Sequence, residues 1–178
     1  MQVISTFNNS WYKPEAGKVK QMLWYFANLL VVKNRYLPIS KVKVRVLKAF
    51  GANIGKGVNI KPGVNIKYPW RLTIGNYVWL GEGVWIDNLA NVTIEDNVCI
   101  SQGAMLLCGN HNYKKTSFDL MLGEIILEES CWIGAQSVVC PGVTVAKNAI
   151  LSVGSIATRN LEANGIYQGN PAVKVRMR

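Results

Sequence analysis

Histidine is almost absent from this chain of 178 residues, which contains only His111. A zinc hydratase site needs three histidines, and even subunits that share ligands would have one unique histidine to offer. We therefore expect no metal centre. The chain also has no C-x-x-C pair, so we expect reduced thiols at its four cysteines, which are Cys99, Cys108, Cys131 and Cys140.

Targeting and membrane-spanning sequences are missing as well. Residues 1 to 12 lack the basic head and small-residue cleavage site of a signal peptide, so we expect a cytoplasmic protein. The apolar run Met22 to Val32 covers eleven residues, against about twenty needed to cross a bilayer. No phosphate loop, dinucleotide fingerprint or G-x-S-x-G elbow is present, which leaves ATP binding, NAD binding and serine-hydrolase chemistry without support.

Acidic residues are few, with ten against twenty lysines and arginines, and the net charge is +10. The basic residues concentrate at the two ends of the chain, in Lys13 to Lys48 and from Arg159 onward. No nucleic-acid-binding motif accompanies them, so we expect no nucleic-acid partner. The phosphates of a nucleotide cofactor and an anionic membrane surface, at the inner face of the membrane, are better candidates.

Residues 54 to 157 carry a repeat in which a branched aliphatic residue recurs every sixth position. This period fits neither an α-helix nor simple strand alternation, and hexapeptide periodicity is typical of a β-helix. The fourteen anchor positions are Ile54, Ile60, Ile66, Ile74, Leu80, Ile86, Ile94, Ile100, Leu106, Leu127, Ile133, Val139, Val145 and Leu151.

The phasing of these anchors predicts a triangular coil. The anchors restart at 54, 74 and 94, so three hexapeptides plus two residues would make one coil, with equivalent anchors stacked on one face. From 127 onward the step falls to eighteen. In a regular array the anchor after Leu106 would be residue 112, so the segment 107–126 carries fifteen inserted residues at one corner. We expect it to form a protruding loop.

The chain ahead of the repeat predicts an arm and a helix. Residues 15–35 are expected to be helical, whereas residues 40–50 fit a helix or a strand. The helix could cap the end coil or pack on a neighbouring subunit, or it could lie in a membrane interface. We thus expect three parts: an arm and helical segment (1–50), a solenoid (51–160), and a basic C-terminal tail (161–178).

Four motifs resemble those of the left-handed β-helix acyltransferases: IGKGV at 54–58, LGEGV at 80–84, CWIGAQSVVCPGVTV at 131–145 and GNPAVKV at 169–175. Within that family the chain is most similar to the colanic acid and exopolysaccharide O-acetyltransferases. The resemblance covers nearly the whole chain. It implies an all-β solenoid, a left-handed parallel β-helix, and a homotrimer with active sites at its subunit interfaces.

His111 stands on the inserted loop and is the chain's only histidine, the residue type whose side chain ordinarily changes charge near neutral pH. The resemblance implies that His111 matches the catalytic histidine of that family. Transfer of an acyl group from a thioester to a hydroxyl needs a base of this kind. We therefore predict His111 as the general base of a direct transfer, with no covalent intermediate.

An imidazole base needs partners that orient it, and stacking places residues 87 to 93 beneath the start of the loop. Family members often have an aspartate directly after the histidine, where this chain has Asn112. A charge for the imidazolium would then come from Asp87 or Glu124, although a turn aspartate is more often a local cap. The predicted supporting or acceptor-binding residues are Asp87, Asn88, Asn110 and Asn112, with Asn91 a further candidate.

In the resembled enzymes acetyl-CoA lies in a groove between two subunits, beside the later coils. Matching residue by residue implies the donor-binding residues Trp132, Ala135, Val153, Thr158, Arg159 and Arg176. The guanidinium groups suit phosphate recognition, although a solvated basic tail would look the same. Aromatic residues near the loop corner could stack on sugars or pack against a neighbouring subunit; these are Tyr68, Trp70, Trp79, Trp85 and Tyr113.

The resulting hypothesis is an acetyl-CoA-dependent O-acetyltransferase that acts on a sugar or a lipid-linked oligosaccharide. Three alternatives stay open: an amino sugar or antibiotic as acceptor, an acyl carrier protein as donor, and a non-catalytic β-helix module that binds partners. The loop around His111 argues against a pure scaffold.

Overall fold

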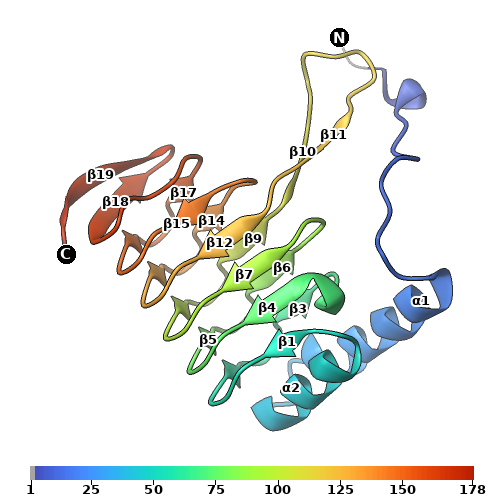
Figure 1. Ribbon diagram of the computed structural model, residues 1–178, viewed down its shortest axis with the longest axis horizontal. Coiled ribbons are helices and arrows are strands. Elements are labelled where there is room, and N and C mark those ends of the chain that lie inside the picture. The colour runs from blue at the N-terminus through green and yellow to red at the C-terminus, as the bar shows by residue number, and fades with distance from the viewer. Residues whose placement is uncertain (1–2) are drawn as a thin grey trace.

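The six-residue period appears in the computed structural model, which describes residues 3–178, as short parallel strands on three faces of a solenoid (Figure 1). Face A consists of β1 (Asn53–Ile54), β4 (Leu72–Ile74), β7 (Val92–Ile94), β12 (Ile125–Leu127) and β15 (Thr144–Val145). Face B contains β2 (Asn59–Ile60), β5 (Trp79–Leu80), β8 (Cys99–Ile100), β13 (Trp132–Ile133) and β16 (Ile150–Leu151). Face C consists of β3 (Asn65–Ile66), β6 (Trp85–Asp87), β9 (Met105–Leu107), β14 (Val138–Val139) and β17 (Ile156–Ala157).

The strand register confirms the predicted phasing. Ile54 is paired with Ile74 and Ile74 with Ile94, which is the step of twenty, and Leu127 is paired with Val145, which is the step of eighteen. Leu127 also pairs with Ile94, so the inserted segment is excluded from the coil. All fourteen anchors are at most 4% exposed. The core is therefore a column of stacked aliphatic side chains, and burying each contributes about 1.5–3 kcal/mol.

Two helices close the N-terminal end of the column. Helix α2 (Ser40–Ala49) resolves the helix-or-strand alternative in favour of a helix, and it buries Leu47 and Lys43 completely. The Lys43 Nζ donates to the carbonyl of Lys61 at 2.8 Å, and the Ser40 Oγ accepts from the amide of Ile60 at 2.8 Å. Solenoids need their end coils covered, and α2 supplies that cover.

Helix α1 (Lys18–Ala27) runs on into a π-helical turn, η2 (Asn28–Val32), and docks on face C. Trp24 is 3% exposed, and its Nε1 donates to the carbonyl of Lys67 at 2.8 Å. The Asn28 Nδ2 donates to the Asn65 Oδ1 at 2.8 Å. Within residues 3–178, no helix has both the length and the apolar character needed to span a bilayer.

The C-terminal segment extends the solenoid instead of trailing from it as a tail. Strand β18 (Gly165–Gly169) pairs in parallel with β16, and β19 (Ala172–Met177) folds back antiparallel on β18. Both strands therefore lengthen face B. The basic side chains of β19 are held on the last coil, and the Lys174 Nζ forms an ion pair with Glu162 at 2.7 Å.

The inserted segment forms a two-stranded hairpin that stands out from the corner between faces C and A (Figure 1). Its strands are β10 (Gly109–His111) and β11 (Leu120–Leu122). The hairpin rejoins the coil at Gly123, where an added Cβ would clash with the backbone of Gly142. The N-terminal arm, which includes the short helix η1 (Ile4–Thr6), runs from α1 up to the tip of this hairpin (Figure 1).

Candidate active site

The hairpin holds His111 at the end of β10, paired with Leu120 across the antiparallel ladder. The His111 Nδ1 lies 2.9 Å from the carbonyl oxygen of Phe118. Because a carbonyl only accepts, Nδ1 carries the hydrogen and Nε2 keeps a free lone pair. The neutral ring is thus fixed in the tautomer that can take a proton at Nε2.

Two aromatic side chains pack on the imidazole. The Phe118 ring stacks on it, with centroids 4.4 Å apart and planes 1° from parallel, and Phe7 of the arm meets it edge-on at 5.3 Å. Phe118 has a φ of 50°, a left-handed conformation that is uncommon for a bulky residue. This backbone geometry lets one residue both stack on the ring and hydrogen-bond it.

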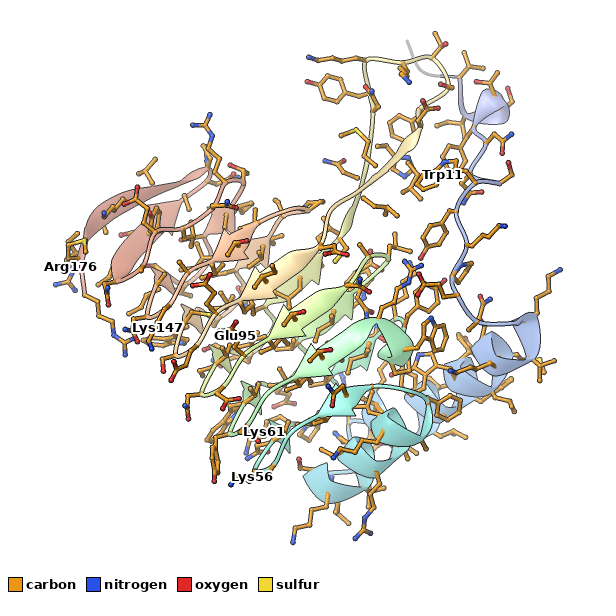
Figure 2. The ribbon with its side chains drawn as sticks, viewed as in Figure 1. Trp11, Lys56, Lys61, Glu95, Lys147 and Arg176 are labelled. Carbon is orange, nitrogen blue, oxygen red and sulfur yellow. The ribbon has the colours of Figure 1, made fainter. Side chains whose placement is uncertain are left out.

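The N-terminal arm is tied down along its length. The amide of Val3 donates to the carbonyl of Thr116 at the hairpin tip at 2.8 Å. At the other end, the Trp70 Nε1 donates to the Pro14 carbonyl at 2.6 Å, and the Arg71 Nη2 forms an ion pair with Glu15 at 3.2 Å. The arm therefore bridges the solenoid and the hairpin, and Trp11 lies on it beside the hairpin (Figure 2).

A cavity of about 930 Å³, here called the His111 cavity, lies between the arm, the hairpin and the solenoid. Its wall is made by Phe7, Asn9, Ser10, Tyr12 and Pro14 of the arm, Lys18 of α1, Lys67, Tyr68 and Leu89 of the solenoid, and His111 and Leu120 of the hairpin. The Tyr12 hydroxyl donates to the Leu89 carbonyl at 2.9 Å, and burial raises the pKa of this tyrosine to about 12. Tyr12 is thus a neutral residue in the cavity wall at neutral pH.

The predicted supporting residues do not orient the ring, because the Phe118 carbonyl takes that role. Asp87 forms an ion pair with Lys67 at 2.9 Å and lines a separate cavity of about 340 Å³ beneath α1. Asn88 is fully buried, and its amide both accepts from the amide and donates to the carbonyl of Tyr68, at 2.9 and 2.6 Å. Asn88 therefore has a structural role in stacking the coils.

The remaining loop candidates shape the hairpin. The Asn110 Oδ1 accepts from the amide of His111 at 2.8 Å, and the Asn112 Oδ1 accepts from the amide of Lys114 at 3.1 Å. The Asn91 Nδ2 donates to Glu124 at 2.8 Å, so the Glu124 carboxylate is engaged at the base of the hairpin. Within residues 3–178, none of these hydrogen bonds involves the imidazole ring.

Four of the six predicted donor-binding residues line one cavity of about 490 Å³ on face B, here called the Trp132 cavity. They are Trp132, Ala135, Val153 and Arg176. Ser101, Ser152 and Ile166 also line it, and the Ser101 Oγ accepts from the Trp132 indole at 2.9 Å. Arg176 lies at the C-terminal end of the solenoid, far along it from the arm (Figure 2). Thr158 and Arg159 are exposed just after β17 and lie outside this cavity.

The two cavities occupy different corners of the prism. The hairpin leaves between β9 of face C and β12 of face A, whereas the Trp132 cavity is lined from face B and its corner with face C. The full width of face C therefore separates His111 from the Trp132 cavity within one chain.

The sequence comparisons agree with this architecture. The chain is 34% identical, over 160 residues, to the predicted colanic acid biosynthesis acetyltransferase WcaF of Escherichia coli (strain K12), covering 90% of this chain and 88% of that protein. The chain belongs to the hexapeptide-repeat acetyltransferases. It is also 28% identical over 139 residues to the galactoside O-acetyltransferase of the same organism, covering 74% of this chain and 66% of that one. No family model matches the sequence.

Among solved structures, a hexapeptide-repeat acetyltransferase of Vibrio cholerae O1 biovar eltor in complex with acetyl-CoA has a TM-score of 0.81 and 16% identity. The match covers 90% of this chain and 87% of that chain. At this identity the likeness shows the shared fold alone. The fold of this acetyltransferase is therefore that of the family.

The cysteines of this acetyltransferase are poorly suited to nucleophilic catalysis. Burial raises the pKa of the Cys131 thiol to about 12 and that of Cys108 to about 11, and it also raises those of Cys99 and Cys140. A thiol attacks as the thiolate, which is scarce at neutral pH for all four. All four cysteines are free thiols in the structure.

Proposed function

We propose that this acetyltransferase moves an acetyl group from acetyl-CoA to a hydroxyl of a sugar or polysaccharide precursor, with His111 as the general base. The observation that carries the proposal is the Phe118 carbonyl at 2.9 Å from the His111 Nδ1, since it leaves Nε2 free to accept a proton inside a large cavity. Such a positioned base contributes about 10² to 10⁴-fold to the rate.

In the proposed reaction the acceptor hydroxyl attacks the thioester carbonyl while its proton moves to Nε2. The tetrahedral intermediate then collapses, the C–S bond breaks, and the leaving CoA sulfur takes the proton back from the imidazolium. The new C–O ester bond replaces the thioester bond, and His111 returns to its starting state. Because no acyl-enzyme forms, the buried cysteines are not needed.

The His111 cavity is the proposed acceptor site. Its volume of about 930 Å³ falls in the upper part of the range of about 300–1,000 Å³ found for ligand pockets. Tyr68 supplies an aromatic face, while Asn9 and Ser10 supply polar groups for hydroxyls. The amine of Lys18 in the same wall favours an acceptor that carries a phosphate or carboxylate, as a nucleotide sugar or a lipid-linked oligosaccharide does.

The Trp132 cavity is the proposed donor site. Trp132 and Val153 offer apolar surface to a pantetheine chain, and Arg176 offers a guanidinium to phosphate groups. The related Vibrio cholerae structure contains acetyl-CoA, which supports this choice of donor. Acetyl-CoA is an intracellular metabolite, so we place the reaction in the cytoplasm.

We infer a homotrimer, because one chain holds the two halves of the site at different corners. The outward residues of faces B and C are largely apolar, whereas those of face A are mostly Thr or Asn. Faces B and C present Trp79, Cys99, Trp132, Ile150, Trp85, Met105, Val138 and Ile156. A neighbouring subunit packed against these faces would bring its Trp132 cavity to this subunit's His111 cavity.

The test is release of free CoA thiol from acetyl-CoA in the presence of a panel of hexoses, deoxyhexoses, amino sugars and nucleotide sugars. Acceptor-dependent release that falls at least about 10²-fold in His111→Ala supports the proposal. Equal turnover by the variant contradicts the base assignment. Preference for an amino sugar would replace ester formation with amide formation at the same site.

A further inference from the structure

Helix α1 and its continuation η2 present apolar side chains to solvent on the side opposite their contact with the solenoid. The exposed residues recur at spacings of three and four, which places them in one stripe along the helix. They are Val19, Met22, Leu23, Phe26 and Leu30, whose exposed fractions are 67, 56, 54, 52 and 64%. Trp24, on the other side of the helix, is 3% exposed. The helix therefore carries a second apolar face beyond the one that docks it.

The same segment is strongly basic. Residues 16–50 contain eight lysines and arginines and no aspartate or glutamate. Lys43 is buried in the end cap, and the other seven are exposed: Lys18, Lys20, Lys33, Arg35, Lys41, Arg45 and Lys48. An exposed apolar stripe flanked by cations is the pattern of a helix that lies in the interface of an anionic bilayer.

We propose that the stripe on α1 and η2, here called the apolar stripe, binds the surface of a membrane that contains anionic phospholipid. Each basic residue near such a surface strengthens binding about fivefold. A second copy of this chain is a less suitable partner for the apolar stripe, because its own helical segment would place further positive charge, and no carboxylate, beside these cations. The fifteen residues 18–32 are too short to cross the bilayer and suit binding parallel to it.

The position of the apolar stripe gives membrane binding a consequence for the reaction. Lys18, the first residue of α1, lines the His111 cavity. Binding through α1 would therefore hold the cavity close to the membrane surface, where a lipid-linked acceptor is presented. This consequence rests on the proposed function, whereas membrane binding itself does not.

Cosedimentation with vesicles tests the inference without any enzymatic readout. We expect the full chain to partition at least about tenfold more strongly onto phosphatidylcholine vesicles containing phosphatidylglycerol than onto phosphatidylcholine alone. Added salt should weaken this binding. The variant Leu23→Ser/Phe26→Ser/Leu30→Ser should lose at least about tenfold in partition, because it removes the apolar contact but no charge.

A matched control is Tyr77→Ser/Val173→Ser, which removes apolar side chains that are 57 and 61% exposed outside the helical segment. Its partition should equal that of the wild type. Equal binding to both vesicle types, or unchanged binding of the stripe variant, would overturn the inference. A smaller oligomer for the stripe variant in mass photometry would also overturn it, since the apolar stripe would then belong to a subunit interface.

Discussion

Replacing Phe118 with alanine separates the two contacts that this residue makes with the imidazole of His111, the proposed base. The backbone carbonyl that accepts from Nδ1 at 2.9 Å remains, whereas the ring stacked at 4.4 Å is lost. An aromatic pair of this kind is worth about 0.5–1.5 kcal/mol, which corresponds to about twofold to twelvefold in rate. We therefore expect kcat to fall by that factor, with the KM for acetyl-CoA unchanged.

The assay is initial-rate thiol release with the best acceptor of the sugar panel. Phe118→Tyr keeps a stacking ring and should behave as the wild type. Tyr113→Ala removes an aromatic side chain that is 73% exposed on the same hairpin, and it should also leave kcat unchanged. An unchanged rate in Phe118→Ala would refute the role of stacking. A fall beyond about 10²-fold in a folded variant would show that the ring does more than hold the imidazole.

Three further outcomes are expected. Removing residues 1–11 takes Phe7 and its neighbours from the His111 cavity, so the KM for the acceptor should rise at least about tenfold. The KM for acetyl-CoA should stay unchanged. An acceptor KM equal to that of the wild type would exclude the arm from the acceptor site. Burial lowers the pKa of Lys43, so the unfolded state binds more protons between the lowered pKa and the ordinary value of about 10.4. Urea denaturation should show that the free energy of unfolding of the wild type rises relative to that of Lys43→Met as pH increases through that window. A difference between the two proteins that does not change with pH would contradict this expectation. Because burial raises the pKa of Cys131 to about 12 and that of Cys108 to about 11, both thiols should stay unreactive towards a disulfide reagent at neutral pH until the protein unfolds.

The period of six made the solenoid predictable in detail. Buried aliphatic anchors repeat once per strand, so their spacing fixed the register of Ile54 on Ile74 and the site of the insertion. The helical end cap was harder to predict, because apolar and polar residues alternate enough in residues 40–50 to suit a strand. Tertiary contacts such as the hydrogen bond from Lys43 to the Lys61 carbonyl stabilise the helix instead. The C-terminal strands were missed because GIYQGNPAVKVRMR, residues 165–178, has no six-residue period.

The position of His111 on the inserted hairpin was predictable, whereas its surroundings were not. His111 is unique and lies on the insertion, whereas Phe118 orients it through a main-chain oxygen, which carries no sequence signal of its own. Phe7 lies more than a hundred residues away in the chain, in a segment without a periodic pattern. Asn88 illustrates the opposite error, since a buried amide that stacks two coils has the same sequence signature as one that binds a sugar.

The central claim is that His111 of one subunit works with the Trp132 cavity of its neighbour, and complementation between two inactive variants tests it directly. His111→Ala removes the base, and Ala135→Trp fills the cavity of about 490 Å³. In trimers assembled from equal amounts of the two, half of the histidines and half of the cavities are intact, so about a quarter of the shared sites should be complete. We predict about a quarter of the wild-type thiol release, from two proteins that are each inactive alone. No activity in mixed trimers of verified composition would contradict a site shared between subunits.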